Sequence, residues 1–227
     1  MHQDWWKRCL AEGIAAFGFT FLSAGAVCAN RYSGGELGLV GIALASGAAL
    51  TAVTLATAPI SGGHVNPALT IAIAINGSLS RSLAALYVGA QVGGAALAGF
   101  CLAGLYTPEV WRPVALGTPQ LSAEVAFSTG TFIEALLTFV LVFAALQVAA
   151  SRGSTDMVYG LAIGLLVLCG TLVAEPLTGA AMNPARAIGP ALASGTWNDQ
   201  AVYWIGPISG GFIAALACRL LQPAEMS

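Results

Sequence analysis

The chain has 227 residues, of which 57% are hydrophobic and only 8% are charged, and its formal net charge is −2. Soluble domains carry about 25% charged residues, so this composition excludes an ordinary soluble domain and indicates a protein embedded in a lipid bilayer. The eight Lys and Arg residues form no basic stripe, so no nucleic-acid partner is expected.

Six long apolar tracts follow one another along the chain, and each is close to the ~20 residues that a helix needs to cross a bilayer. They cover residues 10–30, 37–59, 83–106, 123–150, 157–174 and 203–221. Acidic residues inside them are few: Glu12 lies in the first tract, and Glu124 and Glu134 lie in the fourth. We therefore predict an all-α membrane protein with six transmembrane helices.

Basic residues set the predicted orientation of these helices, because Lys and Arg are enriched on the cytoplasmic side of membrane proteins. An even number of spans puts both termini on one side, which holds Lys7, Arg8, Arg81, Arg152 and Arg219, against Arg31 and Arg112 on the other. Both termini are thus expected in the cytoplasm. The short termini and loops favour a prokaryotic source, and with it the bacterial inner membrane.

Two short polar segments interrupt the apolar pattern. Each contains the triplet Asn-Pro-Ala: Asn66, Pro67 and Ala68 in the first, and Asn183, Pro184 and Ala185 in the second. Asn is a favoured helix N-cap and Pro is favoured at the first helical position, while Asn76-Gly77 and Ser194-Gly195 are typical helix ends. Each segment predicts a helix of roughly ten residues, or about 15 Å, which is half of a ~30 Å hydrocarbon core.

The sequence divides into two similar halves, residues 8–106 and 122–221, within a single domain that covers residues 1–227. Glu12 and Glu134 occupy matching places near the start of each half. Each half has three full spans, so the second half enters the membrane from the opposite side. Inverted repeats of this kind build pathways at the bilayer midplane, where the two half-helices would meet tip to tip.

Irregular backbone precedes each triplet, and at membrane depth such backbone is tolerated only where it is buried in protein or lines a water-filled cavity. We expect its carbonyl groups to accept hydrogen bonds along a pore; the residues concerned are Gly62, Gly63, His64, Val65, Gly179, Ala180 and Ala181. Glu12 and Glu134 are ionisable groups within spans, which are functional candidates by default. We expect them instead to be structural supports that accept N–H donors from the re-entrant loop of their own half.

With two Asn-Pro-Ala half-helices in an inverted repeat and Arg186 directly after the second triplet, nearly the whole chain resembles the aquaporin, or major intrinsic protein, family. The resemblance implies a homotetramer with one pore in each subunit, through which water and small neutral solutes pass. It also implies that side-chain N–H groups of Asn66 and Asn183 bind the passing solute, while the positive N-terminal ends of the half-helices exclude protons and cations. No cofactor or metal is expected, because the five Cys form no C-x-x-C pair and the two His are far apart.

The solute depends on the four residues that form the narrowest ring in this family. Counting from the triplets places the ring at Ser46, Thr171, Ala180 and Arg186. Water-selective members resemble one another in having Phe and His where this chain has Ser46 and Thr171, and glycerol facilitators have bulky aromatic residues. A wider, hydroxylated ring favours compact neutral polyols. The stretch EPLTGAAMNPARAIGPA resembles the nodulin-like branch and its bacterial relatives, which pass metalloid acids such as silicic, arsenous and boric acid.

Several other functions stay open. A water-selective aquaporin or a glycerol-type facilitator is the main alternative, although Ala187 stands where glycerol facilitators place Asp. A coupled secondary transporter also uses inverted repeats and broken helices, but it would need an acid within its pathway. A structural protein with a closed pore ranks last, and no nucleophile, base or metal cluster indicates an enzyme. Two states are open for Glu175, near the predicted outer mouth: an ion pair with a basic group there, or solvation, which is favoured for an exposed charge.

Overall fold

The computed structural model describes residues 4–151 and 153–221, so Arg152, counted above among the basic residues of one side, lies outside the described residues. The described part is helical and contains no β-strand. Six of its helices are long and apolar enough to cross a membrane: α1 (Trp5–Tyr32), α2 (Gly38–Ser61), α4 (Arg81–Leu105), α6 (Phe127–Ala150), α7 (Asp156–Thr178) and α9 (Val202–Leu221). The predicted all-α fold with six spans is confirmed.

Two short helices begin at the Asn-Pro-Ala triplets, as predicted: α3 (Pro67–Ile75) and α8 (Pro184–Ser194). In each, the asparagine before the helix accepts a hydrogen bond on its side-chain oxygen from the backbone N–H two residues further on, at 2.9 Å for Asn66 and 3.0 Å for Asn183. These are ordinary N-cap bonds, which satisfy N–H groups that the first helical turn leaves free. The helix α8 ends at Gly195, which adopts the left-handed conformation that favours glycine at this position.

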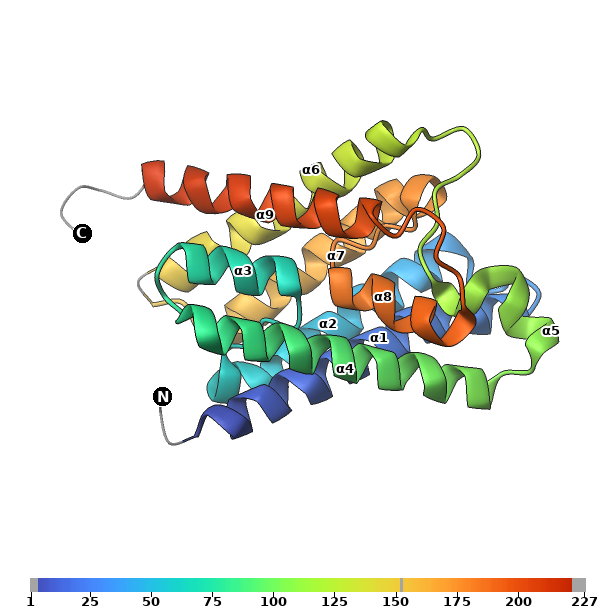
Figure 1. Ribbon diagram of the computed structural model, residues 1–227, viewed down its shortest axis with the longest axis horizontal. Coiled ribbons are helices and arrows are strands. Elements are labelled where there is room, and N and C mark those ends of the chain that lie inside the picture. The colour runs from blue at the N-terminus through green and yellow to red at the C-terminus, as the bar shows by residue number, and fades with distance from the viewer. Residues whose placement is uncertain (1–3, 152, 222–227) are drawn as a thin grey trace.

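The two halves interlock around the short helices. Figure 1 shows α3 and α8 in the middle of the bundle, with α9 and α4 running beside them. The half-helix of the first half, α3, packs against α9 of the second half, and α8 packs against α4 of the first half. The long helices pair within each half, α1 with α4 and α6 with α9, and α2 packs against α7 across the halves. Each half-helix is therefore held by both repeats.

Glycine residues let the long helices pack at close range, which in a membrane favours association through van der Waals contact. A Cβ atom added to Gly47 of α2 would lie 2.7 Å from the carbonyl oxygen of Gly164 in α7. One added to Gly210 of α9 would collide with the backbone of α6 at Ala135. The spaced pair Gly89 and Gly93 of α4 behaves differently, since added Cβ atoms there meet nothing within 4 Å. That pair does not pack within the described part of the chain.

The connection between α4 and α6 folds back onto the bundle. It contains a short helix, α5 (Pro108–Trp111), and a 3₁₀ helix, η1 (Arg112–Gly117), which contacts α1 and α8. Ala115 and Leu116 are buried there and have φ angles of 46° and 54°, a conformation that costs about 1–2 kcal/mol for residues other than glycine. The sequence did not predict this packed loop.

Candidate functional site

The tips of the two half-helices are joined by a reciprocal pair of hydrogen bonds. The Asn66 Nδ2 group donates to the carbonyl oxygen of Met182 at 2.8 Å, and the Asn183 Nδ2 group donates to the carbonyl oxygen of Val65 at 2.9 Å. Both asparagines are buried, with 4% and 3% of their surface exposed. A primary amide carries two N–H donors, so each asparagine keeps one N–H for a molecule that passes the tips.

The space beside the two tips holds about one water molecule. A cavity of about 10 Å³ lies there, and roughly 10–15 Å³ on this measure is what one water needs. Its polar lining comes from Asn66, Asn183 and His64, and the rest is apolar: Phe19, Leu50, Leu69, Leu141, Ile163, Val167, Ala181 and Met182. A molecule at this point has N–H donors on one side and hydrocarbon on the other.

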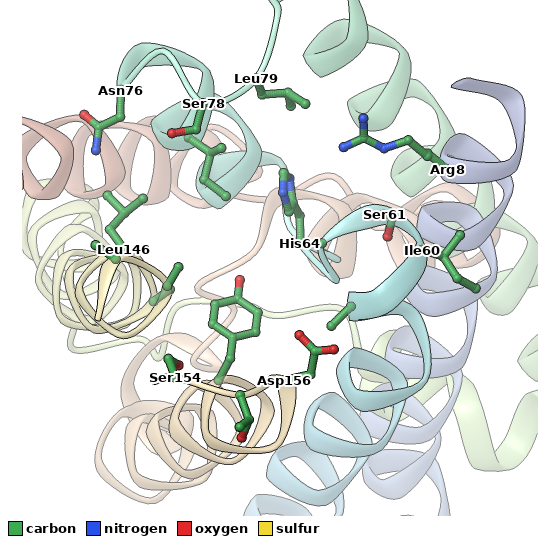
Figure 2. Close-up of a pocket in the computed structure, with 18 residues that line it drawn as sticks. Arg8, Ile60, Ser61, His64, Asn76, Ser78, Leu79, Leu146, Ser154 and Asp156 are labelled. Atoms are coloured by element: carbon green, nitrogen blue, oxygen red, sulfur yellow. The ribbon is translucent and has the colours of Figure 1, made fainter. Parts of the chain in front are cut away.

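A wider cavity lies on the side of the α1 N-terminus. Its volume is about 620 Å³, and Figure 2 shows the side chains of Arg8, His64 and Asp156 among those around it. His64 also lines the narrow cavity, so the two spaces adjoin. The His64 ring packs edge-on against Tyr87 with centroids 5.2 Å apart, and its Nδ1 lies 3.2 Å from the Thr70 hydroxyl. The imidazole is therefore a fixed part of the wall.

A buried carboxylate holds each re-entrant loop. Glu12 accepts hydrogen bonds from the backbone N–H groups of His64 (3.0 Å) and Val65 (2.7 Å). Glu134 accepts the matching two hydrogen bonds in the second loop, from the backbone N–H groups of Ala181 (3.0 Å) and Met182 (2.7 Å). Both acids are fully buried. A structural support of the re-entrant loops requires contacts of this kind.

Polar side chains complete each support in nearly the same way. The hydroxyl group five residues before each asparagine donates to the carboxylate, Ser61 to Glu12 at 2.6 Å and Thr178 to Glu134 at 2.7 Å. A tyrosine hydroxyl then donates to the carbonyl of that residue, Tyr87 to Ser61 at 2.9 Å and Tyr203 to Thr178 at 2.8 Å. Gln91 adds a bond to Glu12 at 2.7 Å. Sequence reasoning missed these groups, although Ser61 and Thr178 have equal spacing to their triplets.

The supported loops have unusual backbone geometry. Val65, Ala180 and Met182 have φ angles of 57°, 42° and 51°, which other residues than glycine rarely adopt. Because the N–H groups of Val65 and Met182 bind the carboxylates, those bonds help to offset the cost of the conformation. Val65, expected among the pore carbonyls, uses one lone pair for Asn183, and Met182, which was not expected, does the same for Asn66.

The four residues of the predicted ring are all buried, with exposed fractions between 3% and 5%. Ser46 lies on α2 and Thr171 on α7, two helices in contact, while Ala180 and Arg186 belong to the second loop and α8. The Thr171 hydroxyl donates to the carbonyl of Val167 at 2.8 Å, which leaves its oxygen free to accept. That the four side chains close one ring stays a prediction.

The guanidinium group of Arg186 is fixed by the packed loop between α4 and α6. Its Nη1 donates to the carbonyl oxygen of Gly117, at the end of η1, at 2.8 Å. An arginine has five N–H donors, and Gly117 is its one hydrogen-bond acceptor among the described residues. Arg186 lines a cavity of about 200 Å³, so its remaining donors are available to a molecule in that space.

Comparison with known proteins supplies the relatives of this chain. The sequence model of the family described as "Major intrinsic protein" matches residues 1–218. The protein named Aquaporin TIP4-4 of Zea mays is 40% identical over 216 residues, which cover 92% of this chain and 84% of that protein. Aquaporin NIP3-1 of Oryza sativa subsp. japonica is 36% identical over 209 residues, which cover 92% of this chain and 66% of that protein. The crystal structure of an aquaglyceroporin from Plasmodium falciparum has the same fold, with a TM-score of 0.83 at 21% identity over 95% of this chain and 98% of that one.

Proposed function

This chain belongs to the major intrinsic protein family, whose members are membrane channels for water and small solutes, and from that premise we propose its solute class. The proposed solutes are small uncharged molecules, above all metalloid acids (silicic, arsenous and boric acid) together with water. Protons and ions are excluded. The metalloid class also fits the resemblance of residues 175–191 to the nodulin-like branch.

The observation that carries this proposal is the size and chemistry of the side chains proposed to form the ring. Ser46 and Thr171 stand where water-selective members have Phe and His, and Ala180 adds only a methyl group. A ring of this kind is wider and presents hydroxyl oxygens together with the donors of Arg186. A compact molecule whose hydroxyl groups point in all directions can exchange its hydration shell for these groups, which lowers the cost of entering the constriction.

Exclusion of ions follows from the arrangement at the tips. The N-terminal ends of α3 and α8 face each other beside the narrow cavity, and each helix end carries about half a positive charge. A cation or a proton therefore meets a barrier, whereas a neutral molecule with lone pairs is bound by the free N–H groups of Asn66 and Asn183. The two acids nearest the loops, Glu12 and Glu134, are occupied by loop donors. Their engagement by the loops favours a structural role for both acids and disfavours a coupled transporter, which needs an acid in its pathway.

The proposal extends to the assembly and its membrane. We propose a homotetramer with one pore in each subunit and with both termini in the cytoplasm, in the inner membrane of a bacterium. The orientation rests on the basic residues of the α1 start and of the α4 start, Lys7, Arg8 and Arg81. The relatives reported above are plant proteins, so they do not favour a bacterial source.

A water-selective aquaporin and a glycerol-type facilitator are the alternatives, and the relatives carry names from two plant subfamilies. Stopped-flow light scattering on proteoliposomes separates the three, with water, glycerol and silicic acid as solutes and arsenous acid measured by uptake. Metalloid flux well above that of protein-free vesicles, together with fast water flux, is the expected result. Fast water flux without metalloid or glycerol flux would mean a water channel, and it would refute the proposed solute class.

A further inference from the structure

We propose that Glu175 is a specificity residue of the pore, which with Arg186 forms a two-charge binding point at the outer mouth for a neutral solute with several hydroxyl groups. The choice of solute rests on the proposed function. The participation of Glu175 rests on separate observations, namely the cavity that it lines and the asymmetry between the two repeats. From the sequence, two states were open for this acid, an ion pair with a nearby basic group and solvation, and solvation was favoured.

Glu175 and Arg186 line the same cavity of about 200 Å³, together with Gly117, Thr118 and Gln120 of the loop between α4 and α6. A cavity needs roughly 10–15 Å³ on this measure to hold one water, so this one has room for several waters or for one small polyol with its remaining hydration. Glu175 is only partly exposed.

The two opposite charges share the cavity without touching. Among the described residues there is no ion pair between Glu175 and Arg186 within 4.0 Å. The two groups therefore do not satisfy each other, and both stay available to a solute in the cavity. Direct contact would instead have closed the mouth and satisfied both groups with each other.

The inverted repeat provides an internal control for the role of Glu175. The residue eight positions before Asn183 is Glu175, and the residue eight positions before Asn66 is Ala58. Each precedes a proline, and each accepts the same backbone bond from a glycine N–H four residues on, at 3.0 Å in both halves. The turn forms equally well on alanine, so the carboxylate is not needed for the fold.

The second charge is asymmetric in the same way. Arg186 lies three residues after Asn183, and the matching position after Asn66 is Leu69. Both members of the charge pair thus belong to the same half of the repeat, where they line one cavity. A carboxylate that the turn does not require, and that lines the same cavity as Arg186, points to recognition of what enters the pore.

The chemistry of the pair defines the solute. Arg186 donates N–H groups to a solute oxygen, and the Glu175 carboxylate, which can only accept, takes a hydroxyl hydrogen of the same molecule. A molecule with several hydroxyl groups satisfies both at once, as boric acid and glycerol do. The carboxylate also cancels the charge of Arg186, so the mouth does not accumulate anions, which a lone arginine would attract.

The test compares the full-length wild type with Glu175→Ala, which copies Ala58 of the first half, and with the isosteric Glu175→Gln. The matched control is Glu109→Gln on α5, an acid outside the cavity lining. Hydrogen bonds from its own backbone N–H and from Thr107 lower the pKa of Glu109, so it too is charged at neutral pH. Boric acid and water permeabilities are measured by stopped-flow on proteoliposomes, and the water flux reports that each variant is folded.

Glu175→Ala is expected to lower the ratio of boric acid to water permeability by roughly three- to tenfold, the size of one charge-assisted hydrogen bond at a partly hydrated site. The ratio for Glu175→Gln should lie between those of the wild type and Glu175→Ala, and the ratio for Glu109→Gln should match that of the wild type. A ratio unchanged in both Glu175 variants overturns the proposal. If Glu175→Ala does not fold, Glu175→Gln carries the same comparison.

A wild type that conducts water but not boric acid would remove boric acid from the proposed solutes, and a second measurement then tests Glu175. A polyol that binds at the mouth and cannot pass must then slow the water flux. The slowing by boric acid should be present in the wild type and lost in Glu175→Ala. No slowing in the wild type, or equal slowing in the variant, overturns the binding point.

Discussion

Glu134→Gln exchanges one carboxylate oxygen for an NH₂ group without a change in side-chain size. In the wild type, Oε1 accepts from the Thr178 hydroxyl (2.7 Å) and the Ala181 N–H (3.0 Å), while Oε2 accepts from the Met182 N–H (2.7 Å). A glutamine can keep its oxygen on the first two donors. Its NH₂ group then faces the Met182 N–H, so two donors oppose each other in a fully buried place.

The loss has a defined size and place. A hydrogen bond to a charged acceptor contributes about 1.5–3 kcal/mol, and a buried donor without a partner costs about 1–3 kcal/mol, so we expect the variant to lose about 2–4 kcal/mol of stability. The displaced group is Met182, whose φ is 51° and whose carbonyl accepts the Asn66 amide. Movement there disturbs the tips of both half-helices, so water permeability per folded protein should also fall.

The assay is thermal unfolding of the purified variant together with its osmotic water permeability in proteoliposomes. Glu12→Gln should be at least as harmful, since each oxygen of Glu12 accepts from two donors: Ser61 and His64 on one, Val65 and Gln91 on the other. A Glu134→Gln protein with the melting temperature and water permeability of the wild type would refute the reasoning, because the loop would then not depend on a carboxylate.

Three further predictions concern the ring and the helix contacts. Ser46→Phe combined with Thr171→His should narrow the pore, keep water permeation and abolish flux of larger solutes; surviving metalloid or glycerol flux in stopped-flow assays would show that these positions do not form the ring. Arg186→Ala removes the positive charge at the mouth and leaves that of Glu175. Cation conductance across planar bilayers should then rise from its background value, and an unchanged background would mean that the half-helix tips alone form the barrier to ions. Gly210→Leu should prevent folding or lower the melting temperature, because even a Cβ atom there collides with α6. The control Gly89→Leu should match the wild type, because a Cβ atom there meets nothing within 4 Å. Equal melting temperatures for the two variants would contradict the packing of α9 against α6.

Local chemistry is the reason that much of the fold could be predicted from the sequence. The six spans follow from the low charge density of their tracts, and the limits of α3 and α8 follow from Asn66-Pro67 and Asn183-Pro184, whose caps act within a few residues. The inversion of the repeat follows from an odd number of spans in each half. None of these inferences needs to know which helix lies beside which.

Contacts between distant segments could not be predicted in the same way. The bonds from Asn66 to Met182 and from Asn183 to Val65 join residues more than a hundred positions apart. The second bond occupies one lone pair of the Val65 carbonyl, which was expected to face the pore. The spacing of Gly89 and Gly93 matches that of Gly206 and Gly210, yet only the second pair meets a helix in the described part of the chain. Spacing shows that a close approach is possible, and the packing decides whether a partner is there.

The sequence by itself determined that this chain is a six-span membrane protein with two opposed half-helices, because hydrophobicity, capping and repeat symmetry are properties of short segments. Only the tertiary structure decided how the pore is walled, because that depends on groups brought together from separate elements. The Gly117 carbonyl reaches Arg186 through the packed loop between α4 and α6, which contains left-handed residues. Glu175 lines the same cavity from the end of α7. These groups meet at one cavity because the folded chain brings separate elements together, and no short stretch of sequence predicts that arrangement.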